Sequence, residues 1–132
     1  MAVDKQYKRE NERYLIDMAK EEGVYALECG VLYRIIEDAG GPKPRSTSSV
    51  IVDYEGRLIN DEVFDSSYER RKPSQFKVTD LIKGWREALK KMPCGSTWEI
   101  YIPYDMGYGT RPMGKIPAYS TLIFKVSLLD VR

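Results

Sequence analysis

The sequence predicts an α+β domain: a twisted antiparallel β-sheet curled around one central α-helix, with a helical extension at the N-terminus. Residues 79–95 carry apolar side chains at a spacing that places them on one face of a helix. Several shorter segments have apolar residues at every second position, as strands with one buried face do. A chain of 132 residues has room for one such domain with a modest core.

The N-terminal segment, residues 4–22, is charged and favours a helix, and Gly23 is a suitable stop for it. Its apolar stripe is narrow and consists of Tyr7, Tyr14, Leu15, Met18 and Ala19. Such a helix either packs lightly on the domain as a solvated arm or serves as a dimerisation or spacer element. We therefore expect an arm, residues 1–23, followed by a domain, residues 24–132.

Strands are expected where β-branched and aromatic residues gather or alternate with polar ones. Val50, Val52 and Tyr54 share one face of a strand, which turns Tyr54 toward the core, and Gly56 is a candidate β-bulge. The predicted strands comprise residues 31–36, 50–55, 63–64, 76–78, 98–102 and 122–128.

The central helix is predicted over residues 79–95. Its apolar face consists of Leu81, Ile82, Trp85, Ala88, Leu89 and Met92. Thr79 or Asp80 can cap its start and Pro93 stops it, so the helix is about 20 Å long at 1.5 Å per residue. Gly84 costs about 1 kcal/mol inside a helix, and a close approach of a neighbouring element would explain its presence.

Composition excludes several classes of protein. The net charge of +1 argues against a nucleic-acid partner held by bulk electrostatics, and no apolar run approaches the roughly 20 residues of a membrane span. Histidine is absent, which removes hydrolysis through a histidine base and histidine-ligated metal sites. Two cysteines are too few for a cysteine metal site, so we expect neither a metal nor a cofactor.

The two cysteines, Cys29 and Cys94, are not expected to form a disulfide. If the strand at 31–36 pairs antiparallel with the strand at 98–102, the two thiols lie more than about 20 Å apart. The two cysteines do not indicate in which cellular compartment the protein is found. No apolar signal core follows Met1, so the chain is either cytosolic or the mature form of an exported protein.

Aromatic and branched residues occur where each element would meet the helix. Individually such residues are more often core than site. Asp65 directly follows Phe64 and places a carboxylate beside this cluster, and the long glycine- and proline-rich loop at 104–119 is of the length that tends to be functional. The clustered residues are Tyr54, Phe64, Phe76, Trp85, Tyr108, Ile116 and Phe124.

Short motifs in a fixed order, from Gly30 to the C-terminus, resemble FKBP-type peptidyl-prolyl cis-trans isomerases. With the helical lead-in, the chain is most similar to the bacterial macrophage-infectivity-potentiator type, which is usually exported and often dimeric. The motifs are VDYEG (52–56), VFDSS (63–67), IKGW (82–85), IP (102–103), GYG (107–109), IP (116–117) and TLIF (121–124).

The resemblance implies a proline-binding pocket with a tryptophan floor, and a role for each matching residue. It implies that the Ile82 backbone N–H donates to substrate, that Tyr108 binds a substrate carbonyl and that Arg70 holds Asp65. Ser74 departs from the pocket-edge aromatic of many relatives. The implied catalytic residues are Asp65, Trp85, Tyr108 and Phe124. The implied substrate-binding residues are Tyr54, Phe64, Arg70, Phe76, Leu81, Ile82 and Ile116.

The implied function is acceleration of Xaa-Pro bond rotation during protein folding, by desolvation and positioning, with no bond to substrate made or broken. The implied partners are proline-containing peptides, unfolded or partly folded proteins and immunosuppressant macrolides. The protein is then a monomer or a dimer through its arm, and periplasmic or outer-membrane-associated if a leader was removed, otherwise cytoplasmic. Alternatives are a non-catalytic proline-segment binding module, a folding chaperone, and a hydrolase pairing Asp65 with Glu99 or Asp105.

Overall fold

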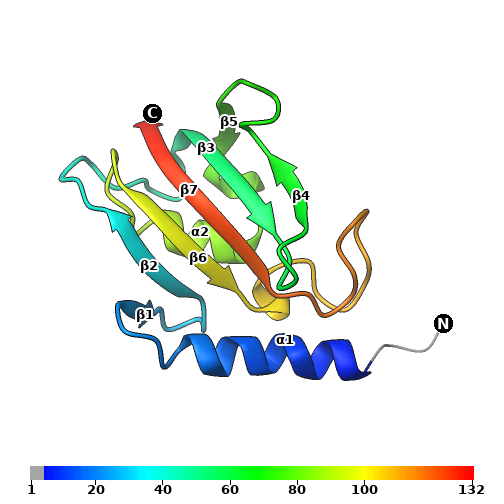
Figure 1. The fold of residues 1–132 in the computed structure, drawn as a ribbon. Helices are drawn as coiled ribbons and strands as arrows, with labels where there is room; N and C mark the ends of the chain where they lie inside the picture. The colour runs from blue at the N-terminus through cyan, green and yellow to red at the C-terminus, as the bar shows by residue number, and fades with distance from the viewer. Residues whose placement is uncertain (1–4) are drawn as a thin grey trace.

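One antiparallel β-sheet of seven strands organises residues 5–132, the part of the chain that the computed structural model describes (Figure 1). The helical segments are α1 (Lys5–Met18), α2 (Lys83–Leu89) and the short 3-10 turns η1 (Val78–Asp80) and η2 (Tyr104–Met106). The strands are β1 (Val24–Ala26), β2 (Leu32–Glu37), β3 (Ser49–Arg57), β4 (Val63–Ser66), β5 (Ser74–Lys77), β6 (Thr97–Ile102) and β7 (Leu122–Val131). The predicted fold class is confirmed. The sequence did not predict β1.

Strand β3 pairs on one side with β7 and on the other with two short strands, β4 and β5. The strand order is β1-β2-β6-β7-β3-β4. Strand β5 pairs with the part of β3 that β4 does not cover. The first half of β3 pairs with β5 and its last three residues pair with β4, with a register shift between Gly56 and Arg57. The irregularity lies on β4, where Phe64 is the extra residue between the pairs Gly56–Asp65 and Arg57–Val63, and Gly56 itself keeps a regular register with β7. The prediction of a bulge in β3 at Gly56 is therefore wrong, although the register does shift beside this residue.

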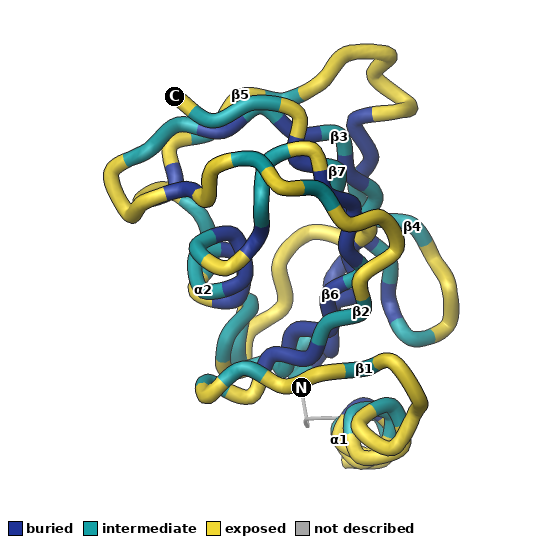
Figure 2. The backbone as a smooth tube through the Cα atoms, turned by 90° about the vertical axis from the view of Figure 1, so that its left-hand side faces the viewer, coloured by how far each residue is buried: buried dark blue, intermediate teal, exposed yellow. Residues whose placement is uncertain are grey.

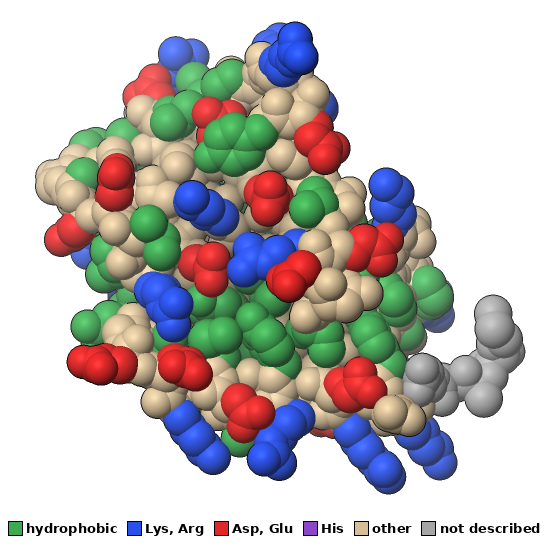
Figure 3. Space-filling model, in the orientation of Figure 1, with side chains coloured by type: hydrophobic (Ala, Val, Ile, Leu, Met, Phe, Trp, Pro, Cys, Tyr) green, Lys and Arg blue, Asp and Glu red, His purple; other side chains and the backbone are tan. Residues whose placement is uncertain are grey.

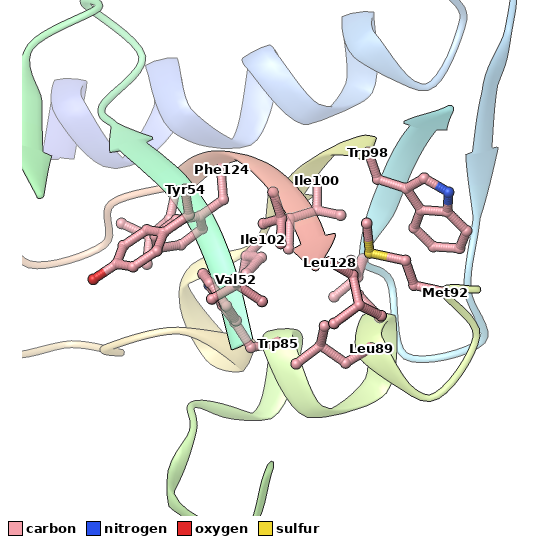
Figure 4. Close-up of a cluster of buried hydrophobic side chains, with 14 of the residues drawn as sticks. Val52, Tyr54, Trp85, Leu89, Met92, Trp98, Ile100, Ile102, Phe124 and Leu128 are labelled. Carbon is pink, nitrogen blue, oxygen red and sulfur yellow. The ribbon is translucent and has the colours of Figure 1, made fainter. Parts of the chain in front are cut away.

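The inner face of the sheet holds the main core, which α2 covers (Figure 2). Strand β3 has a strict alternation of buried and half-buried residues, and it turns Tyr54 inward as predicted. Figure 4 shows Trp85 rising from α2 toward β3, with Tyr54 and Phe124 at one end of the cluster and Trp98 and Met92 at the other.

Helix α2 is much shorter than predicted. It has seven residues, about 10 Å of helix, instead of the predicted 20 Å. Leu81 and Ile82 are extended, with ψ of 159° and 155°, so neither Thr79 nor Asp80 caps it. The apolar spacing cannot separate a helix from an extended lead-in that also turns Leu81 and Ile82 toward the core, and packing decides between them.

Helix α1 lies across one end of the outer face. Its residues Tyr14, Leu15 and Met18 pack over a small buried cluster made by Leu32, Tyr101 and Ile123. In Figure 3, Lys and Arg side chains gather along the free edge of this helix. Among residues 5–132, no helix combines the length and hydrophobicity needed to cross a bilayer.

The two cysteines are free thiols, as predicted. Strands β2 and β6 pair antiparallel, with Leu32 opposite Tyr101, which is the arrangement the expectation assumed. Cys29 precedes β2 and Cys94 follows α2, at opposite ends of this strand pair.

Candidate active site

A cavity of about 300 Å³ opens on the inner face between α2 and the edge of the sheet formed by β3, β4 and β5. Nine of the eleven predicted site residues line it. They are Tyr54, Phe64, Asp65, Phe76, Leu81, Ile82, Trp85, Tyr108 and Phe124. The aromatic cluster that the sequence left as either core or site therefore surrounds an open space.

The indole of Trp85 lines this cavity and packs against three other aromatic rings. Its ring centre lies 5.2 Å from that of Tyr54, 5.1 Å from that of Phe124 and 6.1 Å from that of Phe76. Each pair is close to perpendicular, at 80° to 88°, which is a preferred geometry for aromatic pairs. Trp85 is 4% exposed, so its neighbours cover most of the side chain while one side still borders the cavity.

Two glycines allow this packing. Gly56 pairs with Phe124 on β7 and with Asp65 on β4, so it lies at the point where three strands bring site residues together. A Cβ atom on Gly56 would lie 2.6 Å from the ring of Phe124 and 2.7 Å from that of Phe64. A Cβ on Gly84 would lie 2.6 Å from Ile102, which confirms the close approach predicted for that residue.

A hydrogen-bonded network forms the polar side of the cavity. The Asp65 carboxylate accepts from the Tyr54 hydroxyl at 2.5 Å and from Arg70 Nη1 at 2.5 Å. Arg70 Nη2 also donates to the Tyr54 hydroxyl at 2.9 Å and to Ser74 Oγ at 3.1 Å. Arg70 therefore holds Asp65, as the resemblance implies, and Ser74 accepts a further hydrogen bond from the same guanidinium.

The network sets the charge of the site. Burial raises the pKa of Asp65, but the hydrogen bonds from Tyr54 and Arg70 outweigh burial and hold that pKa below its ordinary value. Burial, followed by the charge of Asp65, raises the pKa of Tyr108. At neutral pH the site thus presents a carboxylate and a protonated phenol, and neither has the near-neutral pKa of an efficient proton carrier.

Two predicted residues do not line the cavity. Arg70 acts on it through Asp65. Ile116 is 5% exposed and belongs to the core, because a tight turn closed by backbone hydrogen bonds between Met113 and Ile116 directs it inward.

Asp80 lines the cavity and was not predicted. In the sequence it is a candidate helix cap, but in the structure it ends η1, directly before the extended residue Leu81, and lines the cavity. No pattern in the sequence signals this role.

The geometry does not favour a carboxylate pair. Glu99 lies on the outer face, where it accepts from the Tyr101 hydroxyl and pairs with Arg57. Asp105 is exposed beside α1, at a groove separate from the cavity. Within residues 5–132, no group of three or more acidic or cysteine side chains is placed to hold a metal ion.

The sequence of the chain matches a known protein family. The model of the family described as FKBP-type peptidyl-prolyl cis-trans isomerase matches residues 40–129. The chain is 46% identical over 123 residues, 92% of its length, to the FKBP-type 22 kDa peptidyl-prolyl cis-trans isomerase of Escherichia coli, and 41% identical over 126 residues, 95% of its length, to the outer membrane protein MIP of Legionella longbeachae.

The fold comparison agrees. A crystal structure of a peptidyl-prolyl cis-trans isomerase from Pseudomonas syringae pv. tomato superposes with a TM-score of 0.92 at 31% identity, over 99% of this chain and 97% of that one. The chain spans 60% of the Escherichia coli relative and 54% of the Legionella relative. On this evidence the chain belongs to the FKBP-type peptidyl-prolyl cis-trans isomerase family.

Proposed function

We propose that this domain catalyses cis-trans isomerisation of Xaa-Pro peptide bonds by holding the proline ring in the cavity above Trp85. The observation that carries the proposal is the cavity itself. It is lined mainly by aromatic rings, Trp85 among them, and the Asp65 carboxylate and the Tyr108 phenol are its polar groups. The cavity fits a five-membered apolar ring, and the polar groups lie where the flanking carbonyls of a bound peptide would pass.

The reaction makes or breaks no covalent bond to substrate. Rotation about the peptide bond is opposed by a barrier of about 18 to 20 kcal/mol, because amide resonance is lost as the bond twists. A twisted amide is less dipolar than a planar one. Moving the bond from water into an aromatic cavity therefore disfavours the planar ground state more than the transition state, and the rate rises.

Each side of the cavity has a distinct role under this proposal. Trp85 supports the proline ring from below, and Phe124, with the other rings, excludes water from its sides. The Tyr108 hydroxyl donates to a substrate carbonyl. Asp65, oriented by Arg70, lies near the twisting carbonyl as a fixed charge and does not carry a proton.

The backbone N–H of Ile82 is a second donor under this proposal. It lies at the N-terminal end of α2, where backbone N–H groups have no intrahelical acceptor. Ile82 also lines the cavity, so this donor and Tyr108 can hold two points of one peptide.

We infer that the substrates are proline-containing peptides and segments of unfolded or partly folded proteins. A macrolide that fills the same cavity would compete with them. We also propose the division into an arm, residues 1–23, through which a dimer would form, and an isomerase domain, residues 24–132. The family match over residues 40–129 and the position of α1 outside the inner core support this division.

The experiment is exchange spectroscopy by NMR on a short Xaa-Pro peptide. Wild-type protein at substoichiometric amounts should speed cis-trans exchange. Phe124→Ala and Trp85→Ala should each lower kcat/KM by at least about tenfold, the equivalent of about 1.4 kcal/mol. Leu129→Ala on the same strand as Phe124 is the control, since Leu129 is exposed.

Two outcomes would contradict the proposal. If folded Phe124→Ala and Trp85→Ala both retain wild-type kcat/KM, the cavity is not the site of catalysis. If the wild type only broadens peptide signals at stoichiometric amounts, the domain is a binding module and not an isomerase.

A further inference from the structure

Helix α1 buries one of its residues almost completely, and that residue is polar. Asn11 is 1% exposed. Its side-chain Oδ1 accepts a hydrogen bond from the Thr121 backbone N–H at 2.7 Å, and its Nδ2 donates to the Tyr7 backbone oxygen at 2.8 Å. The Thr121 hydroxyl donates to the Asn11 backbone oxygen at 3.2 Å. An unpaired amide is costly to bury, and both ends of this one are bonded, so the position of Asn11 depends on the Thr121 backbone.

The neighbouring residues of α1 contact the same short segment. The Tyr7 hydroxyl lies 2.7 Å from Ser120 Oγ, which itself donates to the Pro117 backbone oxygen. Lys8 Nζ lies 5.1 Å from the ring centre of Tyr119. Helix α1 thus contacts three consecutive residues, 119–121, that end the loop between β6 and β7.

This segment is connected to the cavity by hydrogen bonds. The Tyr119 backbone N–H donates to the Gly109 oxygen at 3.0 Å, and the Gly109 N–H donates to the Tyr104 oxygen at 2.8 Å. The Tyr104 and Tyr119 rings pack edge to face at 4.9 Å. Tyr108, which lines the cavity, precedes Gly109 directly.

The backbone of Tyr119 requires support from its surroundings. Its φ is +64°, in the left-handed region that a non-glycine residue adopts at an energetic cost. The contacts of α1 with the Tyr119 ring and with the next residue, Ser120, are suited to hold it there.

We propose that α1 is a brace that fixes Tyr108 at the mouth of the cavity, with Asn11 as the positioning residue. The inference rests on the proposed isomerase function for its catalytic consequence. Its effect is confined to one wall: the opposite wall, which carries Phe64, Asp65 and Phe76, belongs to strands paired with β3 at the far edge of the sheet. The arm therefore has a part in the active site without touching substrate.

Amide hydrogen exchange tests the brace directly. In Asn11→Ala, exchange of the amides in residues 104–121 should rise at least tenfold, with Thr121 among the most affected, while residues 63–77 keep wild-type protection. Arg13→Ala is the matched control, since this exposed residue on the same helix bonds to Asp17. It should change neither segment.

A double-mutant cycle tests the link to Tyr108. Asn11→Ala should lower kcat/KM several-fold in the wild-type background and have little further effect in Tyr108→Phe, because the two changes remove the same contact with substrate. Additive effects of the two substitutions would overturn the proposal. So would unchanged exchange in residues 104–121, or an equal rise in residues 63–77.

Tyr7→Phe serves if Asn11→Ala does not fold. It removes the hydroxyl at Ser120 and leaves the Asn11 hydrogen bonds in place, so it should produce a smaller rise in exchange over the same residues. The proposed function is tested separately. If the wild type does not accelerate peptide isomerisation, the isomerase proposal fails, and hydrogen exchange alone decides whether α1 holds the loop.

Discussion

The two faces of the sheet are held by different kinds of contact. The inner face packs a large apolar cluster against α2, and one side of that cluster opens into the cavity. The outer face buries Leu32, Tyr101 and Ile123, and α1 is attached to that side of the molecule by apolar packing at its C-terminal end and by the hydrogen bonds of Asn11 at its middle. The inner face provides the shape of the site and the outer face provides its bracing.

The same strands serve both purposes. On β6, Ile100 and Ile102 enter the inner core while Tyr101 between them is buried under α1. A substitution on either face should therefore show which contribution it removes. Inner-face changes should lower stability and activity together, and outer-face changes that leave the Asn11 contacts intact should lower stability alone.

The largest expected effect is that of Gly56→Ala on the inner face. The added methyl would lie within 3 Å of the Phe124 and Phe64 rings and force both to shift. Overpacking of this kind typically costs about 1 to 3 kcal/mol, and displaced cavity walls should also lower kcat/KM. Urea unfolding and the peptide exchange assay measure the two effects.

Gly40→Ala is the control for that substitution, since no atom lies within 4 Å of a Cβ built there and its φ is not in the left-handed region. A Gly56→Ala variant with wild-type stability and activity would show that the inner face is loosely packed, and the contrast between the faces would then disappear.

On the outer face, Tyr101→Phe should have a smaller effect and spare activity. The Tyr101 hydroxyl donates to Glu99 Oε1 at 2.5 Å, and its ring packs against Tyr14 of α1. Removing the hydroxyl keeps the ring, so unfolding free energy should fall by about 1 kcal/mol with kcat/KM unchanged. A loss of activity larger than the loss of stability explains would contradict the division between the faces.

The inner face could be predicted from the sequence to a large extent, and the outer face could not. The alternation at Val50, Val52 and Tyr54 and the ordered family motifs identified the walls of the cavity, because both depend on patterns within single elements. The contacts of Asn11 join residues 110 positions apart. A single asparagine in a charged helix gives no signal of its distant partner, so the sequence predicted the helix and its apolar stripe but not these hydrogen bonds.

Within the inner face, the errors have a common cause. The apolar pattern at residues 79–95 favoured one long helix, but Leu81 and Ile82 are extended because they turn toward the cavity and the core. Because α2 begins only at Lys83, Asp80 does not cap it as predicted, and this residue lines the cavity instead. A pattern shows which residues face inward, and packing decides the backbone that achieves it.

The polar side of the cavity should make the stability of the fold depend on pH. The pKa of Asp65 is lower in the folded protein than its ordinary value of 3.8, so the carboxylate stabilises the fold above that pH. This contribution should begin to fall near pH 3.8 and be lost as the pH falls through the lower, folded pKa. The carboxyl and its partner Arg70 are 40% and 48% exposed, so solvent screening limits the effect to below about 1 kcal/mol.

Thermal unfolding between pH 7 and pH 2.5 measures that effect in wild type and Asp65→Asn. The difference in Tm between them should be largest at neutral pH and shrink in acid. Asp17→Asn is the control, because its partner Arg13 is 74% exposed on α1 and the pair should contribute little at any pH. A difference independent of pH would mean that Asp65 acts through shape and not through charge.

The smallest expected effect distinguishes two acidic residues that line different pockets. Asp80 lines the cavity and Asp105 lines a groove beside α1. A peptide with lysine next to its proline should be attracted by Asp80, so Asp80→Asn should raise its KM by up to about fivefold, as expected for an exposed charge pair worth up to about 1 kcal/mol. Asp105→Asn should leave KM unchanged, and 0.5 M salt should remove the Asp80 effect because it screens exposed charges. An equal change for a neutral peptide would show that Asp80 shapes the cavity mouth and does not select charge.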